Sequence, residues 1–364
     1  MTRPFRIAYV INSMEGGGAQ SPLPAIVEAI AAADAEVQVF ALARKDGRAI
    51  AALEEIGVTP QIFPGGLGDH AGAYRWAARQ IADFAPDAIW TSLTRATLIG
   101  QVIGERMGVP VASWQHSAFL KPWNARLLRW RRKASDIWIA DSSAVAAVMR
   151  DTLKITPERM VTWPIFFASP EAPQAPPWQE GMTVEAAAMG RLHVSKGYDV
   201  LIDALALLKT AGLPPFRVTI GGSGPDEAAL RDRAQRAGVD NVRLAGFIEE
   251  PREFLALHHL YLQPSRREGF CIAMHEAMQA GLPVIVSRTG EMPYTVEDPA
   301  MGRIVPVENA AALAEAIADL LRDPSRLVAM GKTARARVLD RFSKDRFEAS
   351  AATIVERLRA AARP

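Results

Sequence analysis

The sequence is poor in cysteine and in net charge. Its 364 residues include a single cysteine, Cys271, so the chain cannot form an internal disulfide bond. One thiol is typical of a protein from the reducing cytoplasm, where we expect the chain to act. The formal net charge is only +2, which argues against the extended positive field that nucleic acid attracts. We therefore expect no nucleic-acid partner.

The sequence also lacks any run of the roughly 20 apolar residues that a membrane-spanning helix requires. Arg3 and Arg6 precede an apolar run at residues 7–11, which superficially looks like the start of a secretory leader. The run is shorter than the apolar part of a leader and ends at a glycine-rich loop. We therefore interpret it as the first strand of the fold.

Apolar residues make up 49% of the chain, and its length suits two domains better than one. Short apolar runs alternate with Ala-rich amphipathic stretches, a pattern typical of βαβ units that form a parallel sheet. The expected strands are 5–12, 37–42, 87–93, 110–116 and 136–142, followed by 184–189, 216–222, 241–246, 260–264, 283–287 and 303–307. The expected final helices are 310–321, 325–340 and 344–358.

The alternation pauses between Trp163 and Met182, where five prolines exclude a helix or a central strand. We expect a linker there between two doubly wound, Rossmann-like α/β domains that face a central cleft. The predicted divisions are 1–165 for the first domain, 166–340 for the second, and 341–364 for a final helix, whose own pattern does not indicate what it packs on. Ligands of such sheets bind beyond the carboxyl ends of the strands, so functional residues are expected in the loops that follow strands.

A glycine run, Gly16-Gly17-Gly18, follows the first expected strand. Glycine lets a backbone approach a ligand closely, and the next helix is expected to offer free N–H groups to an anion. A dinucleotide site would instead need the pattern G-x-G-x-x-G and a carboxylate closing the second strand. Position 21 is serine and that carboxylate is missing, so a dinucleotide site is disfavoured. A plain strand-to-helix turn is the other alternative.

Two cations, Arg191 and Lys196, lie on a glycine-flanked loop between an expected strand and a helix that begins near Tyr198. Arginine presents a planar fork to phosphate oxygens and lysine adds a point charge, so the pair suits a diphosphate. A second glycine-rich turn at residues 221–224 precedes Pro225, a residue typical of a helix start. The alternative is that both cations are ordinary solvated side chains.

The most specific segment contains Glu268 and Glu276, separated by seven residues. Glu268 is expected in a loop after a strand, and a helix is expected to begin around Phe270 with Glu276 about two turns along. N–H groups at a helix start hold anionic oxygen, and carboxylates accept hydrogen bonds from sugar or ribose hydroxyls. Taken singly, each glutamate is explained equally well as a surface charge or a first-turn charge favoured by the helix dipole.

In order and spacing, these segments resemble family 4 of the retaining glycosyltransferases, which has the GT-B architecture. The matching segments are GGGAQ, GRLHVSKGYDVLIDAL, GGSGP, PSRREGF, HEAMQAGLPVIVS and GRIVPVENAAALAEAI. The similarity is almost continuous from Gly190 to about Leu321, whereas in the first half it rests mainly on the glycine loop and His116. This asymmetry is expected if the second domain binds the donor and the first binds the acceptor.

The resemblance implies retaining, metal-independent transfer of a hexose-type sugar from a UDP- or GDP-sugar to a glycan or lipid-linked acceptor, without a cofactor. Arg191 and Lys196 would hold the diphosphate, and Glu276 the ribose. The resemblance also implies that the final helix, within 341–364, crosses back to the first domain. The catalytic residues so implied are Glu268, His116, Arg191 and Lys196. The donor-binding residues so implied are Gly17, Gly18, Arg191, Lys196, Gly222, Glu268, Gly269, Phe270, Cys271 and Glu276.

Two departures from the family pattern leave the identity of the sugar open. Cys271 stands where the family commonly has glycine, and Thr289-Gly290 replaces a common pair of glycines. Retention requires a covalent intermediate or same-face attack, and the sequence favours neither. The alternative functions are a nucleotide-sugar epimerase, a sugar phosphorylase, or a non-catalytic protein that binds nucleotide or lipid.

One segment of the first half is strongly basic. Residues 121–133 contain six basic side chains and no acidic one. On a helix, one face would carry Trp123, Leu127, Trp130 and Ala134. The opposite face would carry Arg126, Arg129, Arg132 and Lys133. We expect the tryptophan face to pack on the sheet, and we hypothesise that the basic face contacts the anionic inner surface of a membrane.

Overall fold

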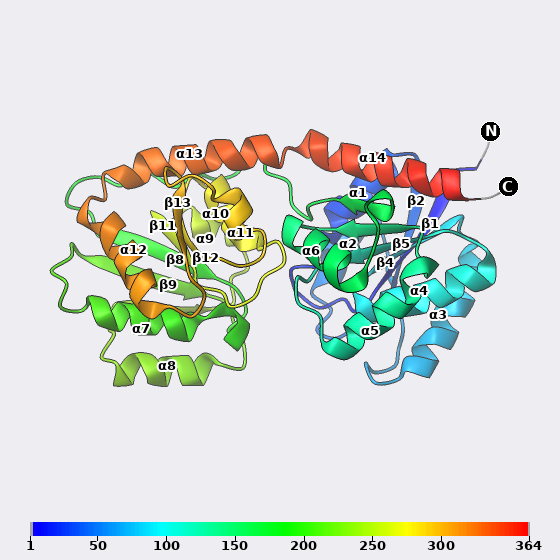
Figure 1. Ribbon diagram of the computed structural model, residues 1–364, viewed down its shortest axis with the longest axis horizontal. Coiled ribbons are helices and arrows are strands. Elements are labelled where there is room, and N and C mark those ends of the chain that lie inside the picture. Colours follow the sequence, from blue (N-terminus) through cyan, green and yellow to red (C-terminus); the bar gives the residue numbers. More distant parts are fainter. Residues whose placement is uncertain (1–2, 363–364) are drawn as a thin grey trace. The chain divides into compact units, whose positions relative to one another are not determined.

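The computed structural model describes residues 3–362, which form two compact α/β units (Figure 1). The first unit comprises the chain up to Phe166 together with the segment from Lys344 onward, and the second comprises Phe167–Ser343. Each unit contains one sheet, and all paired strands of both sheets are parallel. The prediction of two doubly wound, Rossmann-like sheets is confirmed.

The sheet of the first unit has the strand order β3-β2-β1-β4-β5-β6-β7. Its strands are β1 (Phe5–Ile11), β2 (Ala35–Ala41), β3 (Gln61–Ile62), β4 (Ala88–Ser92), β5 (Val111–Gln115), β6 (Ile137–Ala140) and β7 (Met160–Thr162). The edge strands β3 and β7 were not predicted, because two or three residues are too few to show a pattern. The chain reverses its direction of winding between β1 and β4. Such a reversal opens a crevice at the carboxyl ends of the two strands.

The sheet of the second unit has the order β10-β9-β8-β11-β12-β13. Its strands are β8 (Val184–Met189), β9 (Phe216–Gly221), β10 (Val242–Gly246), β11 (Leu260–Gln263), β12 (Val284–Ser287) and β13 (Gly302–Val305). The reversal here lies between β8 and β11. The loops that follow these two strands therefore border the crevice of the second unit.

The helices of the first unit enclose an unusually aromatic core. They are α1 (Leu23–Ala32), α2 (Ala49–Glu55), α3 (His70–Phe84), α4 (Thr94–Met107), α5 (Pro122–Arg131), α6 (Ser143–Val148) and α14 (Lys344–Ala361). Short turns complete it at η1 (Arg132–Ala134), η2 (Met149–Leu153) and η3 (Pro157–Arg159). Trp163 stacks on Trp114 at 4.5 Å between ring centroids, and Phe347 of α14 packs on Trp163 at 4.9 Å. This contact anchors α14 in the first unit.

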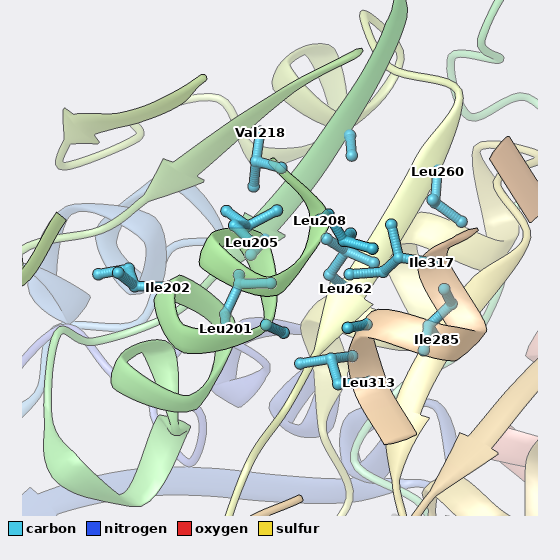
Figure 2. Packing of buried hydrophobic residues seen from close by; sticks show 14 of the residues in the cluster. Leu201, Ile202, Leu205, Leu208, Val218, Leu260, Leu262, Ile285, Leu313 and Ile317 are labelled. Atoms are coloured by element: carbon cyan, nitrogen blue, oxygen red, sulfur yellow. The ribbon is translucent and has the colours of Figure 1, made fainter. Parts of the chain in front are cut away.

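The helices of the second unit pack on its sheet through aliphatic side chains. They are α7 (Tyr198–Leu208), α8 (Glu227–Arg236), α9 (Pro251–Leu255), α10 (Ile272–Gln279), α11 (Met292–Thr295), α12 (Ala310–Arg322) and α13 (Arg326–Arg341), with a turn η4 (Val194–Lys196). Figure 2 shows Leu201 and Leu205 of α7 near Leu313 and Ile317 of α12, against the strands. Full burial of one such side chain contributes roughly 1.5–3 kcal/mol, so this layer stabilises the second unit.

Helix α5 differs from the prediction. Trp123 and Trp130 are 64% and 74% exposed, whereas Leu128 is fully buried. At 100° per residue, Leu128 and Ala125 share a narrow face that packs near Trp138, and the two tryptophans lie opposite it. The prediction that the tryptophan face packs on the sheet is therefore wrong, because a leucine and an alanine fill the available space. Within residues 3–362, no helix has the length and apolar character of a membrane span.

Candidate functional site

Two oppositely charged side chains meet where the second sheet reverses. Lys196 lies in the loop after β8 and Glu268 in the loop after β11, and Lys196 Nζ lies 2.6 Å from Glu268 Oε1. The two side chains are 22% and 8% exposed. Glu268 Oε1 also accepts hydrogen bonds from Ser265 Oγ at 2.6 Å and from Gln263 Nε2 at 3.4 Å. The site thus holds a shielded ion pair with hydrogen-bonding support on the carboxylate side.

The lysine of this pair keeps its charge. Burial alone would lower the pKa of Lys196, but the adjacent Glu268 carboxylate more than offsets it, so the pKa is raised. The ammonium group has three N–H donors, and Glu268 occupies one of them. Burial and the negative charge of Glu268 raise the pKa of Cys271, which stays a neutral thiol and is unsuited to act as a nucleophile.

The loops around the pair are in backbone contact. A Cβ atom on Gly222, which has φ +135°, would lie 2.0 Å from the carbonyl oxygen of Gly190. One on Gly197 would lie 2.1 Å from the carbonyl oxygen of Pro264. Only glycine permits these approaches. Arg191, in the first of these loops, is exposed, and within residues 3–362 it forms no ion pair, so its guanidinium can receive an anion.

The loop after β11 differs from the prediction at the start of its helix. Helix α10 begins at Ile272 rather than at Phe270. Cys271 precedes it with a left-handed φ of 68°, a conformation that a helix cannot continue. Phe270 is buried and its ring stacks on His275 at 4.0 Å. The carbonyl oxygen of Gly269 accepts a hydrogen bond from the backbone N–H of Glu291 at 2.9 Å.

Glu276 lies on α10. Burial raises the pKa of its carboxyl group to about 7, and the charge of Arg252 opposes this shift only in part. The side chain is therefore divided between its protonated and ionised forms near neutral pH. A ligand that donates hydrogen bonds to Glu276 would favour the ionised form.

The glycine loop of the first unit also departs from the prediction. Helix α1 begins at Leu23, five residues beyond Gly18, and Pro24 in its first turn has no N–H group. The carbonyl oxygen of Gly17 accepts hydrogen bonds from the N–H groups of Gln20 and Ser21, at 3.0 and 2.9 Å. A folded turn therefore separates the glycines from the helix. Any anion at this loop would meet backbone N–H groups of the loop itself.

His116 lies directly after β5 and belongs to a buried polar group in the first unit. Its Nε2 atom lies 2.6 Å from Ser92 Oγ, at the end of β4. Its Nδ1 atom lies 3.5 Å from Asp141 Oδ2, directly after β6. Asp141 is fully buried, and neither of its oxygens has a hydrogen-bond partner in the described part of the chain. Ser92 is also fully buried, which keeps its hydroxyl away from any substrate.

The sequence analysis did not identify Ser92, Asp141 or Ser265. Each lies at the carboxyl end of a buried strand or just beyond it. A polar residue at that position was the only feature of the sequence that could have indicated a functional role. Among residues 3–362, no three or more His, Cys, Asp and Glu side chains cluster in a way that could hold a metal ion.

Comparisons with known proteins identify the family and the fold of the chain. The family described as "Glycosyltransferase Family 4" matches residues 16–166, and the family described as "Glycosyl transferases group 1" matches residues 179–337. The GDP-mannose-dependent alpha-(1-6)-phosphatidylinositol monomannoside mannosyltransferase of Mycolicibacterium smegmatis is 35% identical over 42% of this chain and 43% of its own length. The amylovoran biosynthesis glycosyltransferase AmsK of Erwinia amylovora is 33% identical over 47% of this chain and 44% of its own length. The matches thus span less than half of these relatives.

Solved structures are similar over nearly the whole chain. The Anabaena protein Alr3699/HepE, in complex with UDP, has a TM-score of 0.82 and 21% identity, and the match covers 97% of this chain and 100% of that one. The sucrose-phosphate synthase of Thermosynechococcus elongatus has a TM-score of 0.82 and 20% identity, covering 98% and 100%. At these identities the likeness concerns the fold, which is that of the GT-B proteins.

Proposed function

The chain belongs to family 4 of the glycosyltransferases, and from this premise we propose that it transfers a hexose-type sugar from a nucleoside-diphosphate sugar to an acceptor, retaining the anomeric configuration. The observation that carries the proposal is the Lys196–Glu268 pair beside Arg191, at the reversal of the second sheet. A diphosphate requires fixed positive charge, and a sugar requires a hydrogen-bond acceptor. The contact between Lys196 and Glu268 supplies both the positive charge and the hydrogen-bond acceptor.

In this proposal the second unit binds the donor. Arg191 and Lys196 bind the diphosphate, while Glu276 accepts hydrogen bonds from the ribose hydroxyls. Glu268 binds the sugar. Backbone groups complete the site at Gly222, Gly269, Phe270 and Cys271. We propose a UDP- or GDP-sugar, since GDP-mannose appears in the names of relatives and UDP in the structure of the Anabaena protein.

The chemistry follows from charge. As the bond from sugar to phosphate breaks, negative charge grows on the leaving diphosphate, where Arg191 and Lys196 stabilise it from fixed positions. These cations belong to the protein, so we propose that no metal is needed. The carboxylate of Glu268 is held by Lys196 and by Ser265, which favours stabilisation of an oxocarbenium-like sugar over nucleophilic attack.

We assign the acceptor to the first unit, and we keep Gly17 and Gly18 as donor-binding residues and His116 as a catalytic residue, as the family resemblance implies. Nδ1 of His116 lies 3.5 Å from Asp141 Oδ2, and within the described residues the two atoms form no hydrogen bond. The acceptor is a glycan or a lipid-linked intermediate in this proposal. Phosphatidylinositol monomannoside and amylovoran, which appear in the names of two relatives, support this assignment.

We also propose that the first unit associates with the cytoplasmic face of a membrane through α5 and the turn that follows it. Arg126, Arg129 and Lys133 are exposed, while Arg132 is half-buried and donates to the carbonyl oxygen of Arg129. Each basic residue near an anionic surface contributes about 1 kcal/mol. The exposed Trp123 and Trp130 add the ring type that accumulates at membrane–water interfaces. Arg126, Arg129, Lys133 and the two indoles are thus all exposed to solvent within one short segment.

The proposal is tested by transfer itself. Purified protein is titrated calorimetrically with UDP and GDP, and then incubated with a panel of UDP- and GDP-sugars and a membrane lipid extract, with and without EDTA. We expect binding of one nucleotide, acceptor-dependent release of that nucleotide, and no effect of EDTA. Conversion of the donor without an acceptor would indicate an epimerase, and a requirement for inorganic phosphate would indicate a phosphorylase. Binding without turnover would indicate a non-catalytic protein.

A further inference from the structure

One guanidinium joins three segments at the carboxyl edge of the second sheet. Arg266 lies in the loop after β11, two residues before Glu268. Its Nη1 and Nη2 atoms donate to the two carboxylate oxygens of Asp199, in the first turn of α7, at 2.7 and 2.8 Å. Its Nε atom donates to Glu308 Oε1, in the segment after β13, at 2.6 Å. These contacts connect loops that follow β8, β11 and β13.

Arg266 also binds the backbone that precedes Lys196. Its Nη1 atom donates to the carbonyl oxygen of Val194 at 2.8 Å, and its backbone N–H donates to that of Ser195 at 2.8 Å. The two residues before Lys196 are thus held by Arg266, and Gly197 after it abuts the carbonyl oxygen of Pro264. Lys196 is fixed on both sides by the segment that carries Glu268.

The charges of this junction are persistent. The Arg266 side chain is 19% exposed, and those of Asp199 and Glu308 are 32% and 62% exposed. Hydrogen bonding to Asp199 raises the pKa of Arg266, and the same contact lowers the pKa of Asp199. A planar guanidinium with both fork atoms engaged loses little freedom and holds a defined geometry.

We infer that Arg266 is a positioning residue, which sets the geometry of the Lys196–Glu268 pair by holding their two loops together. The inference rests on the function proposed for that pair, and Arg266 itself need not contact the donor. Catalytic groups act only when held in the productive geometry, and a displacement of about 1 Å can cost on the order of a hundredfold in rate. Loss of Arg266 therefore affects donor binding and turnover more than its contribution to stability would suggest.

The test compares Arg266→Gln with Arg303→Gln. Arg303 forms a similar pair in the same unit, with Asp319 at 2.7 Å and with 23% of its side chain exposed, but it ties α12 to β13 instead of the site loops. The measurements are the thermal midpoint, the affinity for UDP and GDP, the donor KM and kcat, and amide hydrogen exchange at residues 190–197 and 264–271. We expect at least a tenfold weaker affinity or higher donor KM, and faster exchange in both loops, for Arg266→Gln alone. Arg266→Lys restores the positive charge without the planar guanidinium, so it should recover only part of the lost affinity and of the slow amide exchange.

Equal falls in the thermal midpoint for the two variants, with unchanged exchange, affinity and KM, would overturn the inference and leave Arg266 a structural residue. Failure of the wild type to bind either nucleotide would reject the proposed function and the inference with it. Faster amide exchange in the two loops of Arg266→Gln, with normal nucleotide affinity and donor KM, would show that ordering these loops does not affect donor binding. That result would likewise overturn the positioning role.

Discussion

At the scale of single residues, the Lys196–Glu268 pair contributes both to the stability of the second unit and to the proposed transfer reaction. Lys196 neutralises a carboxylate that is only 8% exposed, and a buried charge without a partner is strongly unfavourable. Arg191, by contrast, is exposed and forms no ion pair with the residues that the structure describes. The two cations therefore differ in what their removal does to the fold, although we propose that both act on the diphosphate.

We predict that Arg191→Ala lowers turnover more than tenfold and leaves the thermal midpoint unchanged. A hydrogen bond to a charged group contributes roughly 1.5–3 kcal/mol, which corresponds to that loss. Lys196→Ala should lower both turnover and the thermal midpoint. The double variant Lys196→Met/Glu268→Gln, which removes both charges, should recover the midpoint but not the activity. Normal turnover in Arg191→Ala and Lys196→Ala would show that the diphosphate binds elsewhere.

We predict that the pKa of Glu276, raised to about 7, makes donor binding depend on pH, because we propose that this carboxylate binds the ribose. Below pH 7 the side chain is protonated and loses one of the lone-pair acceptors offered to the ribose hydroxyls, so the donor KM should rise as the pH falls through 7. The limiting slope is about tenfold per pH unit. The pyrophosphate of a sugar nucleotide does not titrate in this range. Glu276→Gln should raise KM at pH 8 and flatten its pH dependence; an unchanged profile in this variant would remove Glu276 from the ribose site.

Sequence reasoning at this scale identified residues that stand in recognisable motifs, including Lys196, Glu268 and Glu276. It did not identify Asp141, Ser92 or Arg266, because their roles depend on contacts with distant segments. Arg266, for example, meets Glu308 from a segment 42 positions away. Such pairings follow from the order of strands in the sheet, which local patterns do not contain.

At the scale of secondary-structure elements, α5 is where sequence and structure differ most. Hydrophobicity favoured burial of the indole face, but Leu128 and Ala125 occupy the core and leave Trp123 and Trp130 exposed. The start of α10 is displaced in a similar way, by the left-handed Cys271. In both cases tertiary packing overrides the local pattern, which nonetheless predicted that these helices exist.

The exposed face of α5 leads to a prediction about membranes. The wild type should co-sediment with vesicles that contain anionic lipid and lose this binding in high salt, because salt screens surface charge. Arg126→Glu/Arg129→Glu should abolish binding. The control Arg75→Glu/Arg79→Glu makes the same change in charge on exposed positions of α3 and should still bind. Equal losses in both variants would indicate a general charge effect, and no binding by the wild type would favour a soluble acceptor.

At the scale of the whole molecule, the alternation of apolar strands and amphipathic helices was sufficient to predict two doubly wound sheets. The strand order, with its reversal between β1 and β4 and between β8 and β11, then determines which loops border each crevice. The route of the last helix was stated only through the family resemblance, since its own sequence does not specify what it packs on.

The two units should be distinguishable by their unfolding. Of the eight tryptophans, only Trp178 lies in the second unit, so tryptophan fluorescence reports the first. Phe347→Ala removes the buried ring on Trp163, at a cost of about 3–5 kcal/mol, and should lower the fluorescence midpoint by at least about 6 °C. Phe342→Ala, a buried ring of the second unit, should shift a calorimetric transition but not the fluorescence. Identical shifts by both probes would mean that the units unfold as one.

We propose above all that the chain transfers a sugar with retention of configuration. The most direct test is NMR of the product formed from the α-linked nucleotide sugar that the protein uses, with the one-bond carbon–hydrogen coupling read at the anomeric centre. We predict an α-linked product, formed by the wild type and greatly reduced in Lys196→Ala. A β-linked product, or the absence of transfer from every UDP- and GDP-sugar that the protein binds, would contradict the account.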